Sequence, residues 1–160
     1  MVVLLAACND PSSTASTAPP GALAPNAIVV FVSDGDTIGV EIDGVTERVR
    51  LIGIDTPETK KPNTPVQCFG PEASAFTEGL LPDGTQLYLE RDVEARDQYG
   101  RLLAYAYRTD DGLFVNMAII AGGYARPLTI KPNVAHADEF VAAARAAEAT
   151  AVGLWASCSG

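Results

Sequence analysis

The sequence has few of the residues that bind transition metals or carry out redox chemistry. Its 160 residues include a single histidine, His136, and only three cysteines, Cys8, Cys68 and Cys158. The three cysteines are far apart, so none forms a Cys-x-x-Cys pair. A histidine-rich zinc site, a Cys-x-x-Cys redox site and a multi-cysteine metal cluster are therefore excluded.

Basic and aromatic residues are also scarce. Lys and Arg number 11 against 20 Asp and Glu, which gives a formal net charge of -9, and aromatic residues make up 7%. This acidic balance argues against nonspecific electrostatic binding to nucleic acid or to an anionic membrane surface. A polyanion would have to be bound at a local site. The length and the 48% of hydrophobic residues suit one folded domain.

The first 26 residues differ in composition from the rest of the chain. Residues 1–8 are apolar and end in Leu5-Ala-Ala-Cys8, which resembles a bacterial lipobox, and residues 9–26 are rich in Ser, Thr, Ala and Pro. We expect 1–8 to be a truncated lipoprotein-type signal segment with Cys8 as the lipid anchor. Residues 9–26 would be a disordered tether, because their composition cannot form a core. The alternative is an unmodified apolar terminus or a first strand.

This interpretation places the chain outside the cytoplasm, either lipid-anchored to the cell envelope or secreted. Contact with a membrane would then occur only through the lipid on Cys8. An oxidising compartment permits a disulfide between the other two cysteines, Cys68 and Cys158. The sequence leaves open whether they are bonded or are two buried thiols.

Residues 27–158 show the pattern of a single domain, with no internal repeat. Short β-branched runs alternate with Asp-Gly turns in the first half, and helical patterns dominate the second half. We predict strands at 27–32, 37–42, 45–54, 85–91 and 101–108. Helices are predicted at 70–81, from Asp110 or Asp111 to Ile120, and at 136–149. Five strands with a helix between the third and fourth predict an α+β, mainly β fold: a five-stranded OB-fold barrel with about three helices.

Two aspartates are expected to meet at neighbouring strand ends of this barrel. Asp36 opens the second strand and Asp55 ends the third. Two carboxylates, a backbone carbonyl and water form a hard oxygen site suited to Ca²⁺. With so few charged ligands, the dissociation constant should be on the order of 10⁻⁴–10⁻³ M.

Three further side chains suit a phosphodiester beside such a cation. Arg50, on the third strand, and Arg101, at the start of a later strand, can each bind two phosphate oxygens. Glu58 can accept a proton from water. Taken singly, these residues could also belong to ordinary turns and surface ion pairs.

Seven stretches of the sequence, in order, resemble the staphylococcal nuclease (thermonuclease) family and span nearly all of residues 27–155. They are Asp34-Gly-Asp-Thr37, Arg50-Leu-Ile-Gly-Ile-Asp-Thr-Pro-Glu-Thr-Lys60, Gly70-Pro-Glu-Ala-Ser-Ala-Phe76, Asp97-Gln-Tyr-Gly-Arg-Leu-Leu-Ala-Tyr105, Val115-Asn116, Lys131-Pro-Asn133 and Leu154-Trp155.

The resemblance implies an OB-fold enzyme that hydrolyses DNA and RNA with Ca²⁺ and leaves 3′-phosphate ends. Separately, we expect no obligate protein partner and a monomer, although the sequence leaves the oligomeric state open. By the same resemblance, Asp36, Asp55 and the carbonyl of Thr56 are metal ligands, Arg50 and Arg101 clamp the phosphate, and Glu58 is the general base. Weaker substrate contacts would come from Tyr99, Tyr124, Lys60 and Lys61.

The chain departs from the family where relatives contact the nucleotide. Leu128 and Ile130 replace aromatic residues, and Gln98 replaces a lysine. Because base stacking contributes about 1–3 kcal/mol per base, we expect weaker, salt-sensitive substrate binding.

Two other classes of protein fit the sequence less well than an enzyme does. A non-catalytic OB-fold module binding nucleic acid or protein would keep basic and aromatic surface, and this sequence shows the opposite. A surface module with a Ca²⁺-stabilised loop would not explain both Arg50 and Arg101.

Overall fold

The computed structural model describes residues 23–60 and 63–158. The signal segment with Cys8, most of the predicted tether, and Lys61 lie outside the described residues.

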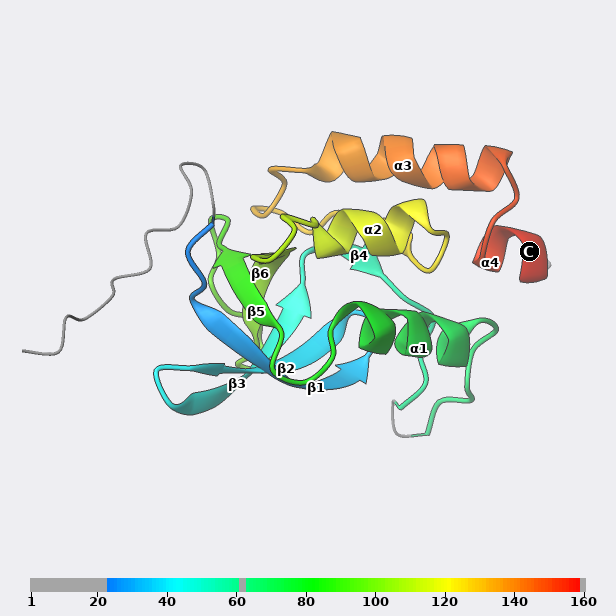
Figure 1. The fold of residues 1–160 in the computed structure, drawn as a ribbon. Helices are drawn as coiled ribbons and strands as arrows, with labels where there is room; N and C mark the ends of the chain where they lie inside the picture. Colours follow the sequence, from blue (N-terminus) through cyan, green and yellow to red (C-terminus); the bar gives the residue numbers. More distant parts are fainter. Residues whose placement is uncertain (1–22, 61–62, 159–160) are drawn as a thin grey trace, which may run out of the picture.

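Five strands close into a barrel, which confirms the predicted fold class (Figure 1). The strands are β1 (Ala27–Asp34), β2 (Thr37–Ile42), β3 (Val45–Leu51), β5 (Gln86–Glu90) and β6 (Leu102–Arg108). They follow the order β1-β2-β3-β6-β5, and every pair is antiparallel except β3 with β6. Alternate apolar side chains such as Val29, Val40 and Leu51 are fully buried and fill the barrel.

The predicted third strand, 45–54, is wrong at its end, because the chain leaves the barrel at Ile52. Gly53 has a positive φ of 82°, and its Cα lies so close to the ring of Phe140 that a β-carbon would collide with it. A short separate strand follows, β4 (Gly53–Asp55), which pairs with β7 (Arg126–Leu128) in a two-stranded sheet. This break carries Asp55 away from the barrel wall.

Four helices are found among the described residues: α1 (Gly70–Leu80), α2 (Val115–Ala121), α3 (Ala137–Ala149) and α4 (Leu154–Ser157). Figure 1 shows α2 and α3 stacked above the barrel and α1 beside β1. The predicted helix start at Asp110 or Asp111 is wrong: Asp111 accepts hydrogen bonds from Arg108 and from the amide of Leu113, and α2 begins at Val115. None of the described helices is long and apolar enough to cross a membrane.

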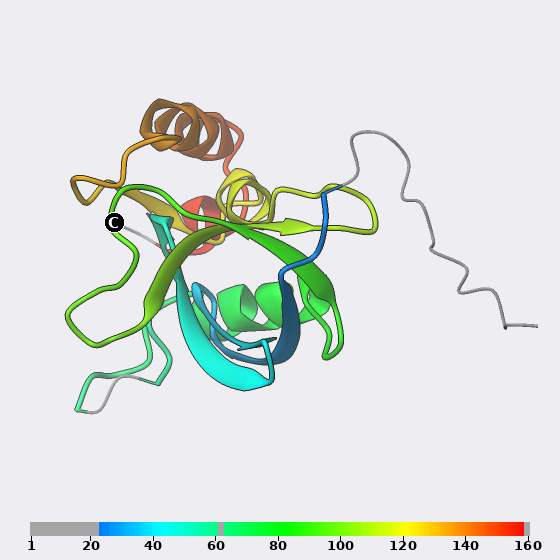
Figure 2. The ribbon, with the colours of Figure 1, turned by 90° about the vertical axis from the view of Figure 1, so that its left-hand side faces the viewer.

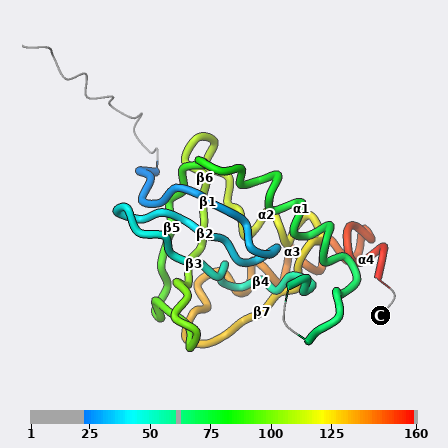
Figure 3. The backbone as a smooth tube through the Cα atoms, turned by 90° about the horizontal axis from the view of Figure 1, so that it is seen from below, coloured from blue at the N-terminus to red at the C-terminus, as the bar shows by residue number. Residues whose placement is uncertain are grey.

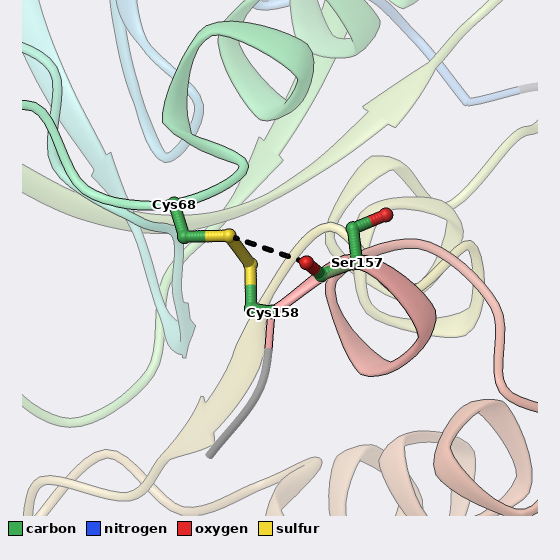
Figure 4. The surroundings of a disulfide bond; sticks show 3 residues. All are labelled: Cys68, Ser157 and Cys158. Atoms are coloured by element: carbon green, nitrogen blue, oxygen red, sulfur yellow. Dashed lines mark hydrogen bonds between the residues drawn. A yellow bond between two sulfur atoms is a disulfide. The ribbon is translucent and has the colours of Figure 1, made fainter.

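Cys68 and Cys158 form a disulfide that joins two distant parts of the chain (Figure 4). Cys68 lies two residues before α1, and Cys158 directly follows α4. Their sequence separation is 90 residues. The dashed line in Figure 4 joins the Cys68 sulfur to the carbonyl oxygen of Ser157, 3.7 Å away. A bonded sulfur has no proton to donate, so this is a close contact between the two atoms.

Candidate active site

A polar groove of about 880 Å³ opens on one side of the barrel. Figures 2 and 3 show that the described parts of the segment before α1, residues 56–60 and 63–69, and the loop between β5 and β6 lie on the same side of the molecule. Of the predicted catalytic, metal-binding and substrate-binding residues that the structure describes, all but Tyr124 line this groove. Its lining is Ser33, Asp34, Asp36, Thr37, Thr46, Glu47, Arg48, Arg50, Asp55, Thr56, Glu58, Lys60, Thr64, Gln67, Tyr99, Gly100 and Arg101.

Asp36 is fixed at the start of β2 by its neighbours. Its side chain is largely buried, its Oδ1 accepts from the hydroxyl of Thr37 at 3.0 Å, and its Oδ2 accepts from the amide of Thr56 at 3.0 Å. Gly35 is needed beside it, because a β-carbon there would lie 2.7 Å from Oγ1 of Thr56. The buried hydroxyl of Thr77, on α1, holds this turn by donating to the carbonyl of Gly35 at 2.7 Å. The position of Asp36 therefore depends on three separate segments.

Arg50 joins the two predicted metal carboxylates. Its Nη2 lies 3.2 Å from Oδ2 of Asp36 and 3.2 Å from Oδ1 of Asp55, so these two oxygens are at most 6.4 Å apart, twice 3.2 Å. Its Nη1 donates to the carbonyls of Leu51 and Ile54, at 2.5 and 2.7 Å. Because these carbonyls lie on either side of the strand break, the guanidinium holds the end of β3 against β4.

Arg101, directly before β6, is held in the groove by Asp97. Its Nε donates to Oδ2 of Asp97 at 2.7 Å, and Oδ1 accepts from the amides of Tyr99 and Arg101. Burial alone would raise the pKa of Asp97, but these hydrogen bonds outweigh it and hold that pKa below its ordinary value. Asp97 therefore stays ionised beside Arg101. No hydrogen bond or ion pair joins either Nη nitrogen of Arg101 to another described residue, so both can bind a ligand.

Glu58 lies in the segment between β4 and α1, with its backbone and its carboxylate both held. One carboxylate oxygen, Oε1, accepts from the amides of Thr59 and Lys60, at 3.2 and 3.0 Å. The backbone amide of Glu58 donates to Oε1 of Gln67 at 2.9 Å, and its carbonyl accepts from the amide of Gln67 at 3.0 Å. Two hydrogen bonds with Gln67 thus hold the backbone of Glu58 in place.

Asp34 is a buried carboxyl beside Glu58 that the sequence analysis did not place in the site. Burial raises its pKa, and a hydrogen bond with the Glu58 carboxyl raises it further, against hydrogen bonds from Gly35 and Thr59. The hydroxyl of Thr59 donates to Asp34 at 2.9 Å. Asp34 therefore ties the start of the Glu58 segment to the end of β1.

The chemistry of the donor set suits a hard cation such as Ca²⁺. Two carboxylates and the Thr56 backbone come together, and the hydroxyl oxygen of Thr56 is buried without a hydrogen-bond partner in the described part of the chain. In residues 23–60 and 63–158, no cluster of three or more His, Cys, Asp and Glu side chains could hold a metal ion. A cation here would therefore depend on two carboxylates, backbone oxygen and water, a set that favours Ca²⁺ over Zn²⁺.

The predicted substrate contacts divide into two groups. Tyr99 is 75% exposed at the rim of the groove, with its ring 5.4 Å from the guanidinium carbon of Arg101, and Lys60 also lines the groove. Tyr124 does not line it: its ring stacks on Phe76 at 3.9 Å and on Phe69 at 5.4 Å, beneath the start of α1. Tyr124 therefore packs against α1 in the structure.

A second, mostly apolar pocket of about 360 Å³ adjoins the groove and shares Arg50, Tyr99 and Arg101 with it. Leu128 and Ile130, the residues that depart from the family pattern, line this pocket. An aliphatic wall thus stands where the resemblance implies stacked aromatic rings.

Arg48 and Gln67 line the groove but escaped the sequence analysis. Arg48 lies two residues before Arg50 on β3, and a period of two places both on one face of a strand, so its signal was present. Gln67 gave no signal, because no sequence pattern links it to its partner Glu58, nine residues away.

Comparisons with known proteins find a family model and several relatives that match most of the chain. The family model described as "Staphylococcal nuclease homologue" matches residues 48–157. The chain is 43% identical over 128 residues to a thermonuclease of Staphylococcus intermedius, an alignment that covers 80% of this chain and 74% of that protein. It is 40% identical over 129 residues to a thermonuclease of Staphylococcus hyicus, covering 81% and 75%. It is also 41% identical over 124 residues to the endonuclease YncB of Bacillus subtilis (strain 168), covering 76% and 57%.

Proposed function

This chain belongs to the staphylococcal nuclease family, and from that premise we propose that it is a Ca²⁺-dependent nuclease that hydrolyses DNA and RNA without regard to the sugar. The observation that supports this most directly is the meeting of Asp36, Arg50, Asp55, Thr56, Glu58 and Arg101 in one groove. These residues come from four separate segments of the chain.

The proposed roles follow from charge and position. Arg50 and Arg101, which both line the groove, would contact non-bridging oxygens of one phosphodiester and stabilise the negative charge of the transition state. Glu58 would take a proton from the water that attacks phosphorus in line with the leaving oxygen. Departure of the 5′ oxygen leaves a 3′-phosphate on the other product.

Asp36, Asp55 and Thr56 would hold the cation. When bound, Ca²⁺ neutralises charge on the phosphate and favours ionisation of nearby water. Lys60 and Tyr99, at the rim of the groove, would contact the substrate strand, as would Lys61. The apolar pocket lined by Leu128 and Ile130 would receive a base through apolar contact.

We also propose that the protein works outside the cytoplasm, anchored by a lipid on Cys8 or secreted, with residues 27–158 as the catalytic domain. The Cys68–Cys158 disulfide supports this location, because such bonds persist in oxidising compartments. A monomer is proposed because one chain supplies the whole site. Mass spectrometry of the native protein tests the anchor, and an unmodified Cys8 would rule it out.

The decisive experiment compares the unsubstituted chain with Glu58→Gln on denatured DNA and on RNA, with Ca²⁺ and with chelator. We expect Ca²⁺-dependent cleavage that Glu58→Gln lowers by about 10²–10⁴-fold. Glu78→Gln, the same change at an exposed position on α1, serves as the matched control and should cleave normally. Products should carry 5′-hydroxyl ends that polynucleotide kinase labels directly.

A folded chain that binds nucleic acid but does not cut it at millimolar Ca²⁺ would contradict the proposal and favour a binding module. Cleavage that survives Glu58→Gln would contradict the role of Glu58. Calorimetric Ca²⁺ titration of the chain and of Asp36→Asn tests the cation site independently of activity.

A further inference from the structure

Gln67 makes hydrogen bonds with both the backbone amide and the backbone carbonyl of Glu58. The amide of Glu58 donates to the Gln67 side chain at 2.9 Å, and the amide of Gln67 donates to the Glu58 carbonyl at 3.0 Å. The two hydrogen bonds close a ring over residues 58–67. No other residue among those described makes hydrogen bonds to both backbone groups of Glu58.

Gln67 is in turn held at its C-terminal side by three features. The next residue, Cys68, is bonded to Cys158 after α4 (Figure 4). The ring of Phe69 stacks on Tyr124, 5.4 Å away. Gly70 lies against the Glu58 segment so closely that a β-carbon would be 3.1 Å from the carbonyl oxygen of Glu58. Gln67, which holds the backbone of Glu58, is therefore connected to the C-terminal part of the molecule.

We propose that Gln67 is a positioning residue for Glu58, and that the Cys68–Cys158 disulfide keeps Gln67 in place. The inference rests on the proposed role of Glu58 as general base. Gln67 itself does not touch the reacting atoms. Its two hydrogen bonds fix the backbone from which the Glu58 carboxylate extends, and a general base displaced by even 1 Å loses much of its effect.

Gln67→Met tests this directly, because Met has a similar shape and lacks the amide oxygen that accepts from Glu58. In the full chain we expect kcat to fall about tenfold or more, with KM and Ca²⁺ affinity nearly unchanged. Gln67→Glu retains an acceptor oxygen and should recover most of the lost kcat. Gln86→Met, the same substitution at an exposed position on β5, is the matched control. Gln67 is itself exposed, so the fold should survive, and circular dichroism checks this.

A double-mutant cycle separates positioning from a general loss of structure. If Gln67 acts only through Glu58, adding Gln67→Met to Glu58→Gln should lower kcat no further. Multiplicative losses would overturn the proposal, as would an unchanged kcat in Gln67→Met when the unsubstituted chain cleaves. No cleavage by the unsubstituted chain would overturn the nuclease function and this role together.

The second half of the proposal is tested with Cys68→Ser/Cys158→Ser. Below its melting temperature, this variant should show kcat lowered by about two- to tenfold, and Gln67→Met should add less than it does to the bonded chain. A folded double-serine variant with the kcat of the unsubstituted chain would overturn the role of the disulfide. Treating the unsubstituted chain with reductant should reproduce the effect, and reoxidation should reverse it.

Discussion

Both terminal nitrogens of the Arg50 guanidinium bind the protein. Its two Nη nitrogens reach two carboxylates and two backbone carbonyls, and its side chain is only 13% exposed. A lysine has a single ammonium group and cannot span this planar set of acceptors. Arg50 therefore organises the carboxylates of the groove in addition to any contact with phosphate.

Arg48 differs from Arg50 in that it is exposed and its guanidinium is bonded only to a neutral side chain. It lines the groove and donates to the hydroxyl of Ser33 at 3.3 Å. We predict that Arg48→Gln weakens binding of DNA to an inactive Glu58→Gln background, because one phosphate contact is lost. The slope of log K against log salt should fall by about one. Fluorescence anisotropy between 50 and 200 mM salt measures both quantities.

Arg145→Gln is the charge-matched control for Arg48, since Arg145 is exposed on α3 and does not line the groove. It should leave the slope unchanged. An equal loss of slope in both variants would show that net charge, rather than a contact made by Arg48, governs binding.

Among single residues, those that sequence analysis placed in the groove share one property: strand ends and turns fix them. Asp36 follows a turn signal that the sequence shows directly. Asp55 was expected at the end of one strand over 45–54, but it lies on the separate strand β4, beyond the break at Ile52. The resemblance alone supplied Thr56, because no property of a threonine marks its backbone as a ligand. The spacing of Arg48 to Arg50 could have identified Arg48, whereas Asp34 and Gln67 depend on partners brought close by the tertiary structure.

At the scale of elements, the break between β3 and β4 is held by one buried amide. The Asn116 side chain, on α2, donates to the carbonyl of Ile52 at 2.9 Å and accepts from the amide of Ala106 at 3.0 Å. Sequence periodicity predicted one strand through 45–54 because Leu51, Ile52 and Ile54 are all apolar. The chain can turn there only because Gly53 allows a positive φ and Asn116 satisfies the backbone.

We predict that Asn116→Ala lowers the free energy of unfolding by about 2–5 kcal/mol. Asn116 is fully buried, and its loss leaves one buried carbonyl and one buried amide without partners. Urea unfolding followed by Trp155 fluorescence measures the change. Gln98→Ala, in the exposed loop between β5 and β6, is the control and should change the free energy by less than about 0.5 kcal/mol. A loss below 1 kcal/mol in Asn116→Ala would show that water replaces both bonds.

The elements that sequence analysis missed are the shortest ones. β7 has three residues and α4 has four, too few for a periodic pattern to show. The start of α2 was misplaced for another reason: Asp110 and Asp111 suit helix caps, but the nearby guanidinium of Arg108 pairs with both. The long helices and barrel strands, whose patterns extend over several turns or alternations, were predicted within a few residues.

Over the whole molecule, hydrogen bonds to carboxylates link stability to pH. Four carboxyls, those of Glu47, Asp92, Asp97 and Asp111, have a pKa below the ordinary value. For Asp92, burial would raise the pKa, but hydrogen bonds from the Ala135 amide, the Tyr105 hydroxyl and the Val93 amide lower it. Asp92 thereby joins the end of β5, the barrel core and the start of α3. The pKa of Asp34 is raised instead, by burial and by its hydrogen bond with Glu58.

We predict that the folded chain loses stability as pH falls below about 4. The unfolded chain protonates Asp92 and Asp97 near their ordinary pKa of 3.8, whereas the folded chain keeps them ionised to lower pH. Their contribution is therefore complete above 3.8 and is lost as pH falls through the folded-state values. Asp34 acts in the opposite direction, since its raised pKa favours the protonated folded form.

Urea midpoints measured between pH 2 and 7 follow this loss, and Asp92→Asn identifies part of its origin. The variant should be less stable at pH 7 and should lose less stability on acidification, because the carboxylate that titrates is gone. Asp83→Asn, in the exposed turn before β5, should keep the full pH dependence. Parallel curves for Asp92→Asn and the unsubstituted chain would show that repulsion within the protonated molecule causes the acid sensitivity, and that the bonds joining β5 to α3 do not.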